Sequence, residues 1–287
     1  MIDRNRIYEI AQQIAKRAGL LRIPWLRKAG MRALQRYRSG SWLLSHEETV
    51  DIDGFQLAVL PRVLPGTFLS RGEIYEPILR DVMRQVLHAG DVAVDVGAHW
   101  GWHTTLMARL VGKAGTVVAF EPLELNRDLL IRNKEQNNLD WIIVRDRIVS
   151  PTSGESVILA YPESNLASAT IMDSSRFVDP RRQEALTARL DSELNALGID
   201  RVQFAKIDVE GAEAKVLQSM GRDLSRYENI YVELHHNYLT PSDYDVIKSL
   251  CVDRQTYTVS EGGLEAIHGS DELGHYGSLL SSIGTLQ

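Results

Sequence analysis

Five short, largely apolar runs rich in β-branched residues recur between residues 91 and 234. They are Val92–Val96, Thr116–Phe120, Trp141–Val144, Phe204–Ile207 and Ile230–Leu234. Helical patterns separate several of them, at Thr104–Val111, Asn126–Asn137 and Ala212–Met220. Buried strands that alternate with helices are typical of a parallel sheet covered on both faces, because each crossover helix packs on one face. We therefore predict an α/β fold with a mostly parallel sheet and helices on both faces.

The chain before this pattern is organised differently. Residues 1–40 carry ten basic and two acidic side chains, whereas the whole chain has a net charge of -6. Apolar residues recur there at three- and four-residue steps, which predicts two amphipathic helices. Thr49–Asp53 and Phe55–Leu60 flank an Asp-Gly pair and predict a β-hairpin. We divide the chain into an extension over residues 1–70, helical and then hairpin, and a Rossmann-like domain over residues 71–287.

The interval between residues 145 and 200 interrupts the alternation. It contains one further short strand, predicted at Ser156–Ala160, and a polar stretch from Tyr161 to about Arg182. A loop of this length in a compact domain is usually functional and is often a lid over a site. The single cysteine excludes an intramolecular disulfide framework. Since the sequence shows no apolar run of about 18 residues and no signal-like start, we expect a cytoplasmic protein.

Residues 95–101, of sequence DVGAHWG, follow the first run and open a helix. At this point a parallel α/β sheet presents backbone N–H groups to a ligand. Gly97 lets the chain turn sharply, and Gly101 lets the helix begin close against the ligand. The spacing is Gly-x-x-x-Gly and not the Gly-x-Gly-x-x-Gly that allows close approach to a pyrophosphate. The pattern therefore favours a ligand without a diphosphate, such as S-adenosylmethionine.

The second run ends in Glu121 and Pro122, about twenty residues after the glycine turn. A carboxylate at this place can accept hydrogen bonds from the two ribose hydroxyls of an adenosine ligand. The alternative is a helix-capping or surface acid. Pro122 can lie flat against the adenine. Asp146, just past the third run, is interpreted either as a partner of the adenine amino group or as an exposed loop acid.

Chemically active side chains follow the fourth and fifth runs. Asp208 and Glu210 come directly after one, and His235 follows the other. The carboxyl ends of neighbouring parallel strands form the crevice in which such sheets bind ligands, so we assign these three residues a catalytic role. In a structural interpretation Asp208 caps the next helix, and Glu210 suits its first turn. We assign Glu213 to that first turn alone.

Six segments, taken in order, resemble the FkbM-type methyltransferases. They are DVGAHWGWHT, VVAFEP, NRDLLIRNKEQNNL, TARLDSEL, FAKIDVEGAE and IYVELHHN, and GEIYEP upstream resembles the lead-in of that family. The resemblance covers about residues 70–240. It implies a class I methyltransferase fold with a seven-stranded sheet, S-adenosylmethionine as methyl donor, and O-methylation of sugars, glycans or natural products. The sequence departs from the family at His99 and Trp100, where Asn-Ile is common.

The resemblance also implies roles for individual residues. Asp95, Gly97 and Gly101 shape the cofactor loop, Glu121 holds the ribose, and Asp208 and Glu210 belong to the fourth-strand motif. With the neighbouring positions added, the predicted cofactor site consists of Asp95, Gly97, Ala98, Gly101, Thr104, Glu121, Pro122 and Asp146.

Methyl transfer to a hydroxyl is an in-line displacement that benefits from positioning and from a general base. We predict His235 as the base, because the pKa of histidine is naturally close to the working pH. Asp208 or Glu210 would orient it or the acceptor, and His103 is the alternative base. In a second hypothesis Asp208 holds Mg²⁺ together with Glu233 or His235, and the ion lowers the pKa of the acceptor.

Two other classes of protein share some of these features. An NAD-dependent oxidoreductase would have the same sheet and Glu121, but should show the closer glycine spacing. A non-catalytic adenosine-binding protein would not need the acidic crevice. We expect a small-molecule or glycan acceptor and consider a homo-oligomer possible, whereas the acidic body disfavours nucleic acid. Residues 1–40 would pack on the body or on a second subunit or, in the alternative, contact an anionic membrane surface.

Overall fold

The computed structural model describes residues 47–52, 54–60, 66–162, 166–172, 175, 177, 179–221, 224–267, 273 and 277–283. The two basic helices predicted within residues 1–40 lie outside this part of the chain, so their proposed contacts stay predictions. No helix in the described part is long and apolar enough to span a bilayer.

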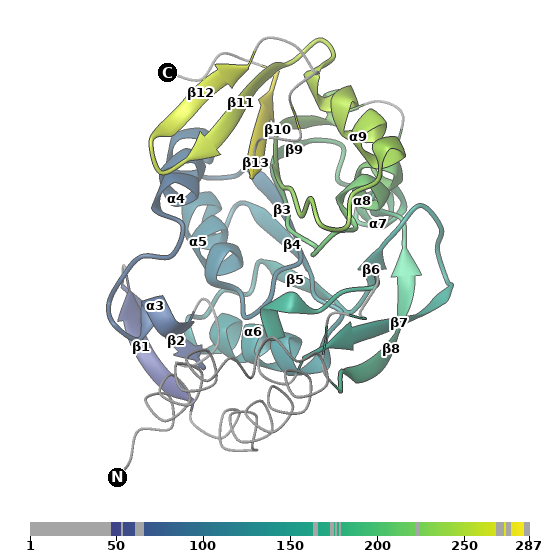
Figure 1. Ribbon diagram of the computed structural model, residues 1–287. Coiled ribbons are helices and arrows are strands. Elements are labelled where there is room, and N and C mark those ends of the chain that lie inside the picture. The colour runs from purple at the N-terminus through teal and green to yellow at the C-terminus, as the bar shows by residue number, and fades with distance from the viewer. Residues whose placement is uncertain are drawn as a thin grey trace, which may run out of the picture.

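After residue 91, strands and α-helices alternate except over residues 142–188 and 255–282, where strands follow one another without an α-helix between them (Figure 1). The strands are β1 (Glu48–Ile52), β2 (Phe55–Val59), β3 (Val92–Val96), β4 (Thr116–Phe120), β5 (Ile142–Arg145), β6 (Ile148–Val149), β7 (Ser156–Tyr161), β8 (Arg181–Ala188), β9 (Val202–Ile207), β10 (Tyr227–Glu233), β11 (Gln255–Ser260), β12 (Gly263–Ile267) and β13 (Ser278–Ser282). The α-helices are α3 (Gly66–Leu69), α4 (Pro77–Val86), α5 (Trp102–Val111), α6 (Glu124–Gln136), α7 (Leu190–Ala196), α8 (Glu213–Ser219) and α9 (Pro241–Ile247).

The central sheet has the order β12-β11-β13-β10-β9-β3-β4-β5. The strands from β10 to β5 are parallel, and β13 lies antiparallel between β10 and β11. This order, read from β5 to β11, is that of a class I methyltransferase, and the predicted fold class is confirmed. The sheet has one strand more than the seven expected. The chain reverses at Glu261 and Gly262, and β12 then adds an antiparallel edge beside β11.

The two faces of the sheet are covered by different helices, because successive strand residues point to opposite sides. Ala93 and Val117 belong to a hydrophobic cluster with residues of α4, α5 and α6. Val94 and Val118, one position further along each strand, belong to a second cluster with residues of α7, α8 and α9. This packing buries the strands on both sides, which explains why their sequences are largely apolar instead of alternating.

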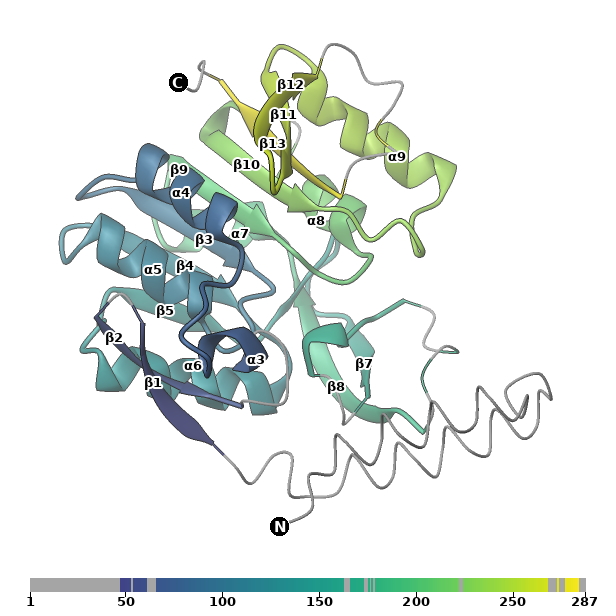
Figure 2. The same cartoon turned by 60° about the vertical axis from the view of Figure 1, so that its left-hand side comes forward.

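The predicted hairpin is confirmed and packs on the domain. β1 and β2 pair antiparallel around Gly54, and Figure 2 shows them beside α6. Asn133 of α6 accepts a hydrogen bond from the Ala58 N–H at 2.7 Å and donates one to the Ala58 carbonyl at 3.1 Å. Leu57, which is 1% exposed, joins the cluster formed with α4 to α6. The hairpin therefore shares the core of the residues that follow it.

A second, smaller sheet has the order β6-β8-β7. It lies apart from the central sheet in Figure 2. Only β7 was predicted, because β8 has a sequence of mixed polarity and alternates between exposed and partly buried side chains. The long segment between β7 and β8 is the stretch interpreted as a possible lid. It carries a short helical turn at Leu166–Ser168.

Candidate active site

A cavity of about 150 Å³ lies at the carboxyl ends of the parallel strands. Parallel strands bring their carboxyl ends to one edge of the sheet, so the loops that follow them surround one space. Most of the lining residues come from the ends of β3, β4, β5, β9 and β10 and the segments after them, from the segment between β7 and β8, and from the start of α5. Ala169 and Ile171 belong to the β7–β8 segment, so the predicted lid stretch does reach the cavity.

The turn after β3 depends on the glycine at position 97. Its φ is 83°, a left-handed conformation that favours glycine. The N–H groups of Gly97 and Ala98 both donate to the Phe120 carbonyl at 3.0 Å. A Cβ atom at position 97 would lie 1.8 Å from the Asp208 carbonyl oxygen. Gly97 thus lets the chain after β3 touch the chain after β9.

Gly101 lies where the start of α5 packs on α6. Its φ is 85°, but a Cβ atom there would meet the Leu130 side chain at 2.3 Å. Gly101 also does not line the cavity, whereas Gly97 and Ala98 do. The glycine therefore allows close packing of the start of α5 on α6, and its expected approach to a ligand stays a prediction.

We expect Gly97→Ala to lower the free energy of unfolding by roughly 3 kcal/mol or more, because the methyl group collides with a carbonyl that cannot move without disturbing β9. Gly154→Ala is the matched control, since Gly154 has a φ of 82° and nothing within 4 Å of its Cβ position. Urea unfolding gives the loss of unfolding free energy for each variant. The loss in Gly154→Ala measures backbone strain alone, and the additional loss in Gly97→Ala measures the collision. Equal losses of stability would contradict the proposed contact.

Asp95 and Thr104 lie beneath this turn. Asp95 is fully buried at the end of β3, and the Thr104 hydroxyl donates to its carboxylate at 2.6 Å. Burial raises the pKa of Asp95, an effect that Lys206 and Thr104 oppose. Neither Asp95 nor Thr104 lines the cavity. Both are buried, and their predicted parts in the cofactor site stay predictions.

Glu121 and Pro122 line the cavity on the β4 side. Glu121 is 5% exposed and accepts hydrogen bonds from the backbone N–H groups of His99 at 2.8 Å and Leu123 at 2.9 Å. Burial raises its pKa to about 7, although these two hydrogen bonds act in the other direction. Each carboxylate oxygen accepts one backbone hydrogen bond and keeps capacity for another. Two buried carboxylate oxygens that can each accept a further hydrogen bond suit the two neighbouring hydroxyls of a ribose.

Asp146 does not line the cavity, and its predicted contact with the cofactor stays a prediction. Its side chain is 56% exposed and pairs with Arg147 at 2.5 Å outside the cavity. The chain after β5 turns so that Arg147, Ile148 and Val149 line the cavity in its place. The alternative interpretation, an exposed loop acid, agrees with the structure.

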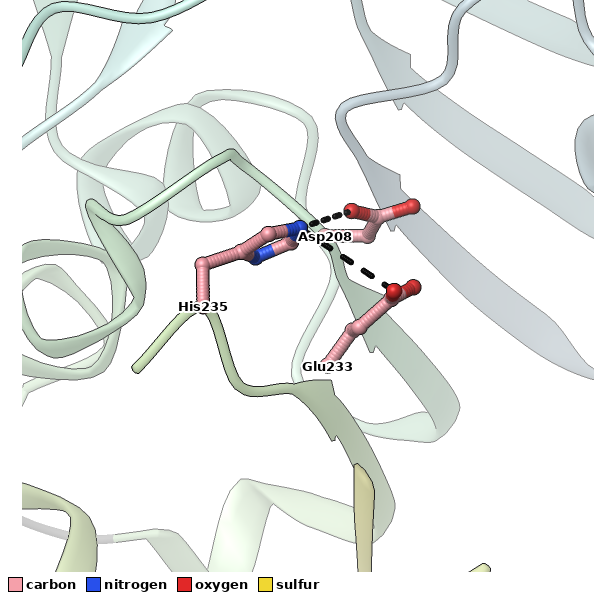
Figure 3. Close-up of side chains that lie close together, drawn as sticks. All are labelled: Asp208, Glu233 and His235. Carbon is pink, nitrogen blue, oxygen red and sulfur yellow. Dashed lines mark ion pairs between the residues drawn. The ribbon is translucent and has the colours of Figure 1, made fainter. Parts of the chain in front are cut away.

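The predicted catalytic residues meet at the ends of two neighbouring strands. As expected, β9 and β10 pair in parallel, with Val232 opposite Ile207. This register brings His235 next to Asp208, as Figure 3 shows. The His235 Nε2 atom lies 3.6 Å from Glu210 Oε1, 3.9 Å from Asp208 Oδ1 and 4.0 Å from Glu233 Oε1. Three carboxylates thus surround one imidazole nitrogen in the wall of the cavity.

The charges in this cluster shift one another's pKa values. Burial alone would lower the pKa of His235, but its hydrogen bond with Glu213 and the charges of Asp208 and Glu210 raise it to about 9. The charge of Asp208 raises the pKa of Glu233 to about 8, and burial adds to this effect. Burial opposes ionisation of Asp208, yet the charge of Lys206 keeps its pKa below the usual value.

Asp208 does not cap the following helix. Ala212 is the N-cap of α8 and makes no side-chain capping bond, so the structural interpretation of Asp208 is not supported. Its carboxylate contacts Lys206 Nζ at 3.0 Å, and Lys206 Nζ also lies 3.8 Å from Asp95 Oδ1. Lys206 lines the cavity with a side chain only 3% exposed. We did not predict a role for it, although a lysine within an otherwise apolar strand was a visible signal.

A second group of side chains in the cavity wall comes from the segment before α4 and from the start of α5. Tyr75, Trp102 and His103 line it, and His103 Nε2 lies 3.3 Å from Glu76 Oε2. Burial lowers the pKa of His103 well below its usual value. Burial also raises the pKa of Glu76 to about 7. Glu76 has a φ of 50°, an uncommon conformation for a residue with a side chain. Tyr75 and Glu76 were noted only as part of the GEIYEP segment.

Comparison with known proteins gives one family. The model of the methyltransferase FkbM domain matches residues 95–258, which include Glu121, Asp208 and His235. No curated protein matches the sequence.

Several solved structures resemble the chain at low identity. An O-methyltransferase from Bacillus cereus in complex with SAH is 14% identical, with 74% of this chain and 83% of that chain covered and a TM-score of 0.43. A SAM-dependent O-methyltransferase from Thermotoga maritima is 14% identical, with 84% and 79% covered and a TM-score of 0.39. A putative methyltransferase from Streptococcus mutans in complex with SAH is 12% identical, with 73% and 98% covered and a TM-score of 0.42.

Proposed function

Because this chain belongs to the FkbM methyltransferase family, we propose that it transfers a methyl group from S-adenosylmethionine to a hydroxyl of a sugar, glycan or natural product. The chain is an S-adenosylmethionine-dependent methyltransferase, and the hypothesis of an NAD-dependent oxidoreductase is therefore withdrawn. The hydroxyl acceptor is the proposed part. The observation that carries it is the imidazole of His235, which stands in the cavity wall with its Nε2 atom toward three carboxylates.

The residues present fit the methyl donor. Glu121 offers two buried oxygen acceptors for the ribose hydroxyls, and Pro122 offers an apolar surface beside them. Asn126 also lines this end of the cavity, and its side chain is held by Trp100 and by the Leu166 carbonyl. When bound, S-adenosylmethionine supplies an electrophilic methyl group on a positively charged sulfur. The surrounding side chains would hold the acceptor oxygen in line with the bond between this methyl group and the sulfur.

The chain's own residues provide the remaining chemistry. His235 accepts the proton of the acceptor hydroxyl at Nε2, and the carboxylates of Asp208 and Glu210 hold the acceptor by accepting hydrogen bonds from its hydroxyls. Lys206 keeps Asp208 ionised, since its ammonium group lies 3.0 Å away. Polyhydroxylated acceptors suit this wall, because carboxylates are hydrogen-bond acceptors only. His103 is a weaker choice for the base, since it is buried against Glu76.

A second candidate is methylation assisted by a divalent cation. Asp208, Glu233 and His235 each present one ligand atom, and these atoms lie within 4.8 Å of one another. Such a set can hold Mg²⁺, which would bind the acceptor oxygen and lower its pKa. The geometry also has an explanation without an ion, because Lys206 and a protonated His235 balance part of the negative charge.

We expect turnover to survive EDTA, because Lys206 already supplies positive charge beside Asp208. The measurement is the initial rate of S-adenosylhomocysteine formation, before and after dialysis against EDTA, with methyl glycosides as acceptor probes. The same assay with added Mg²⁺ or Mn²⁺ is the control. A loss of rate on dialysis that either ion restores would establish the metal-assisted mechanism.

A further inference from the structure

Glu213 is an acid in an unusual environment. It is the first residue of α8, where an acidic side chain favours the helix dipole. Helix-dipole acids normally lie at the surface, but Glu213 is 0% exposed. Burial of a carboxylate is costly unless it is hydrogen-bonded or paired with a cation. The stabilisation of a helix terminus alone does not explain why this acid is buried.

The partners of Glu213 connect it to the cavity. Its Oε1 atom accepts a hydrogen bond from the Gly211 N–H at 2.9 Å and lies 2.7 Å from Nδ1 of His235. Glu213 itself does not line the cavity, whereas His235 does. Glu213 therefore contacts the imidazole at Nδ1, on the side of the ring away from the cavity.

We infer that Glu213 is a positioning residue for His235, and that the two side chains form an acid–imidazole dyad for proton transfer from the acceptor. This inference rests on the proposed function, in which His235 is the base. In the neutral form of the ring, Nδ1–H donates to the Glu213 carboxylate and the Nε2 lone pair faces the cavity. A hydrogen bond of this kind fixes both the tautomer and the orientation of a catalytic imidazole.

The proton balance is simple. The acceptor oxygen would form its bond to the methyl carbon as the bond from that carbon to the donor sulfur breaks, which leaves S-adenosylhomocysteine. The proton of the acceptor O–H would pass to Nε2 of His235. The imidazolium that results is stabilised by the carboxylate of Glu213, which keeps its own charge. After product release the proton passes from Nε2 to water.

The other acids around His235 cannot take this role. Asp208, Glu210 and Glu233 all line the cavity and approach Nε2, at 3.6 to 4.0 Å. An acid on the Nε2 side competes with the acceptor for that nitrogen and does not orient it. Only Glu213, among the described acids, is paired with Nδ1. We therefore propose that Glu213 orients His235, and that Asp208 and Glu210 orient the acceptor.

The experiment uses the full chain saturated with S-adenosylhomocysteine and labelled with ¹⁵N-histidine. The His235 signals are assigned by their loss in His235→Ala. In the wild type we expect the neutral imidazole to carry its proton on Nδ1. Glu213→Gln should lower the titration midpoint of His235 by about one pH unit or more, because it removes a charge-assisted hydrogen bond. Glu213→Asp should preserve most of the midpoint, because it retains the charge.

The matched control is Glu124→Gln. Glu124 is likewise the first residue of its helix, α6, but it is exposed and does not line the cavity. The control should leave the His235 midpoint unchanged. An Nε2–H tautomer in the wild type, or an unchanged midpoint in Glu213→Gln with normal circular dichroism and S-adenosylhomocysteine affinity, would overturn the dyad.

Turnover then separates this inference from the proposed function. With methyl glycosides as acceptor probes and EDTA present, Glu213→Gln should lower kcat by about tenfold or more and leave KM for S-adenosylmethionine nearly unchanged. If His235→Ala retains full turnover, the base assignment fails. If His235→Ala is inactive while Glu213→Gln keeps both its kcat and the wild-type pH profile, only the dyad fails.

Discussion

His235→Ala is expected to lower turnover by about 100-fold or more, with the dissociation constant of S-adenosylhomocysteine within about twofold of the wild-type value. The loss is expected because Nε2 is the proton acceptor in the proposed mechanism. The affinity should be retained because the proposed ribose contacts come from Glu121, on the β4 side of the cavity. Asp208→Asn should act in the same direction by weakening the hold on the acceptor. Steady-state rates and isothermal titration calorimetry measure the two effects separately.

The dependence of turnover on pH provides a further check of this variant. Because the pKa of His235 is raised to about 9, the neutral base form accumulates as the pH rises. Wild-type kcat/KM should therefore increase up to about pH 9, and this rise should be absent from His235→Ala.

The neighbouring histidine offers a matched control for this prediction. His236 stacks on Tyr244, and its Nδ1 atom lies 2.6 Å from the Tyr244 hydroxyl, away from the residues that line the cavity. His236→Ala should keep turnover within about twofold. If His235→Ala behaves like this control, the base has to be sought at Glu210, because His103 is buried against Glu76.

Glu121→Ala should weaken the binding of S-adenosylmethionine by about 2 kcal/mol or more, which is roughly a 30-fold increase in Kd. The carboxylate provides two charge-assisted hydrogen bonds to the ribose in our proposal. The substitution also leaves the N–H groups of His99 and Leu123 without their acceptor. Circular dichroism and the melting temperature must therefore show that the variant is folded before calorimetry is interpreted.

Asp146→Ala is the control for the cofactor contact. Asp146 was predicted beside the adenine, but its side chain lies outside the cavity and pairs with Arg147. Its removal should change the affinity by less than about 0.5 kcal/mol. Unchanged affinity in a folded Glu121→Ala variant would remove the carboxylate from the cofactor site.

Much of the architecture could be predicted because it depends on local sequence periodicity. Val92–Val96 and Thr116–Phe120 appear with the predicted boundaries as β3 and β4. Their apolar sequence reports burial on both faces, and burial on both faces requires helices on either side. The strand β8 escaped prediction, because a surface strand outside the central sheet has no comparable apolar signal.

The site was predictable to the extent that strand ends determine it. Once β9 and β10 are adjacent and parallel, Asp208 and His235 must lie near each other. The order of the strands does not determine the direction in which a side chain of the following loop points. Asp146 therefore turned out to face solvent, and Gly101 to face Leu130.

The sequence by itself determined the fold class, the location of the cavity and several of the residues around it, since these follow from periodicity and from the order of the strands. Only the tertiary structure decided which nitrogen of the His235 ring lies against which acid. Glu213 lies 22 positions before His235 in the chain and follows a different strand. The physical reason is that a hydrogen bond requires two atoms within about 3 Å, and the folding of α8 against the end of β10 brings them together.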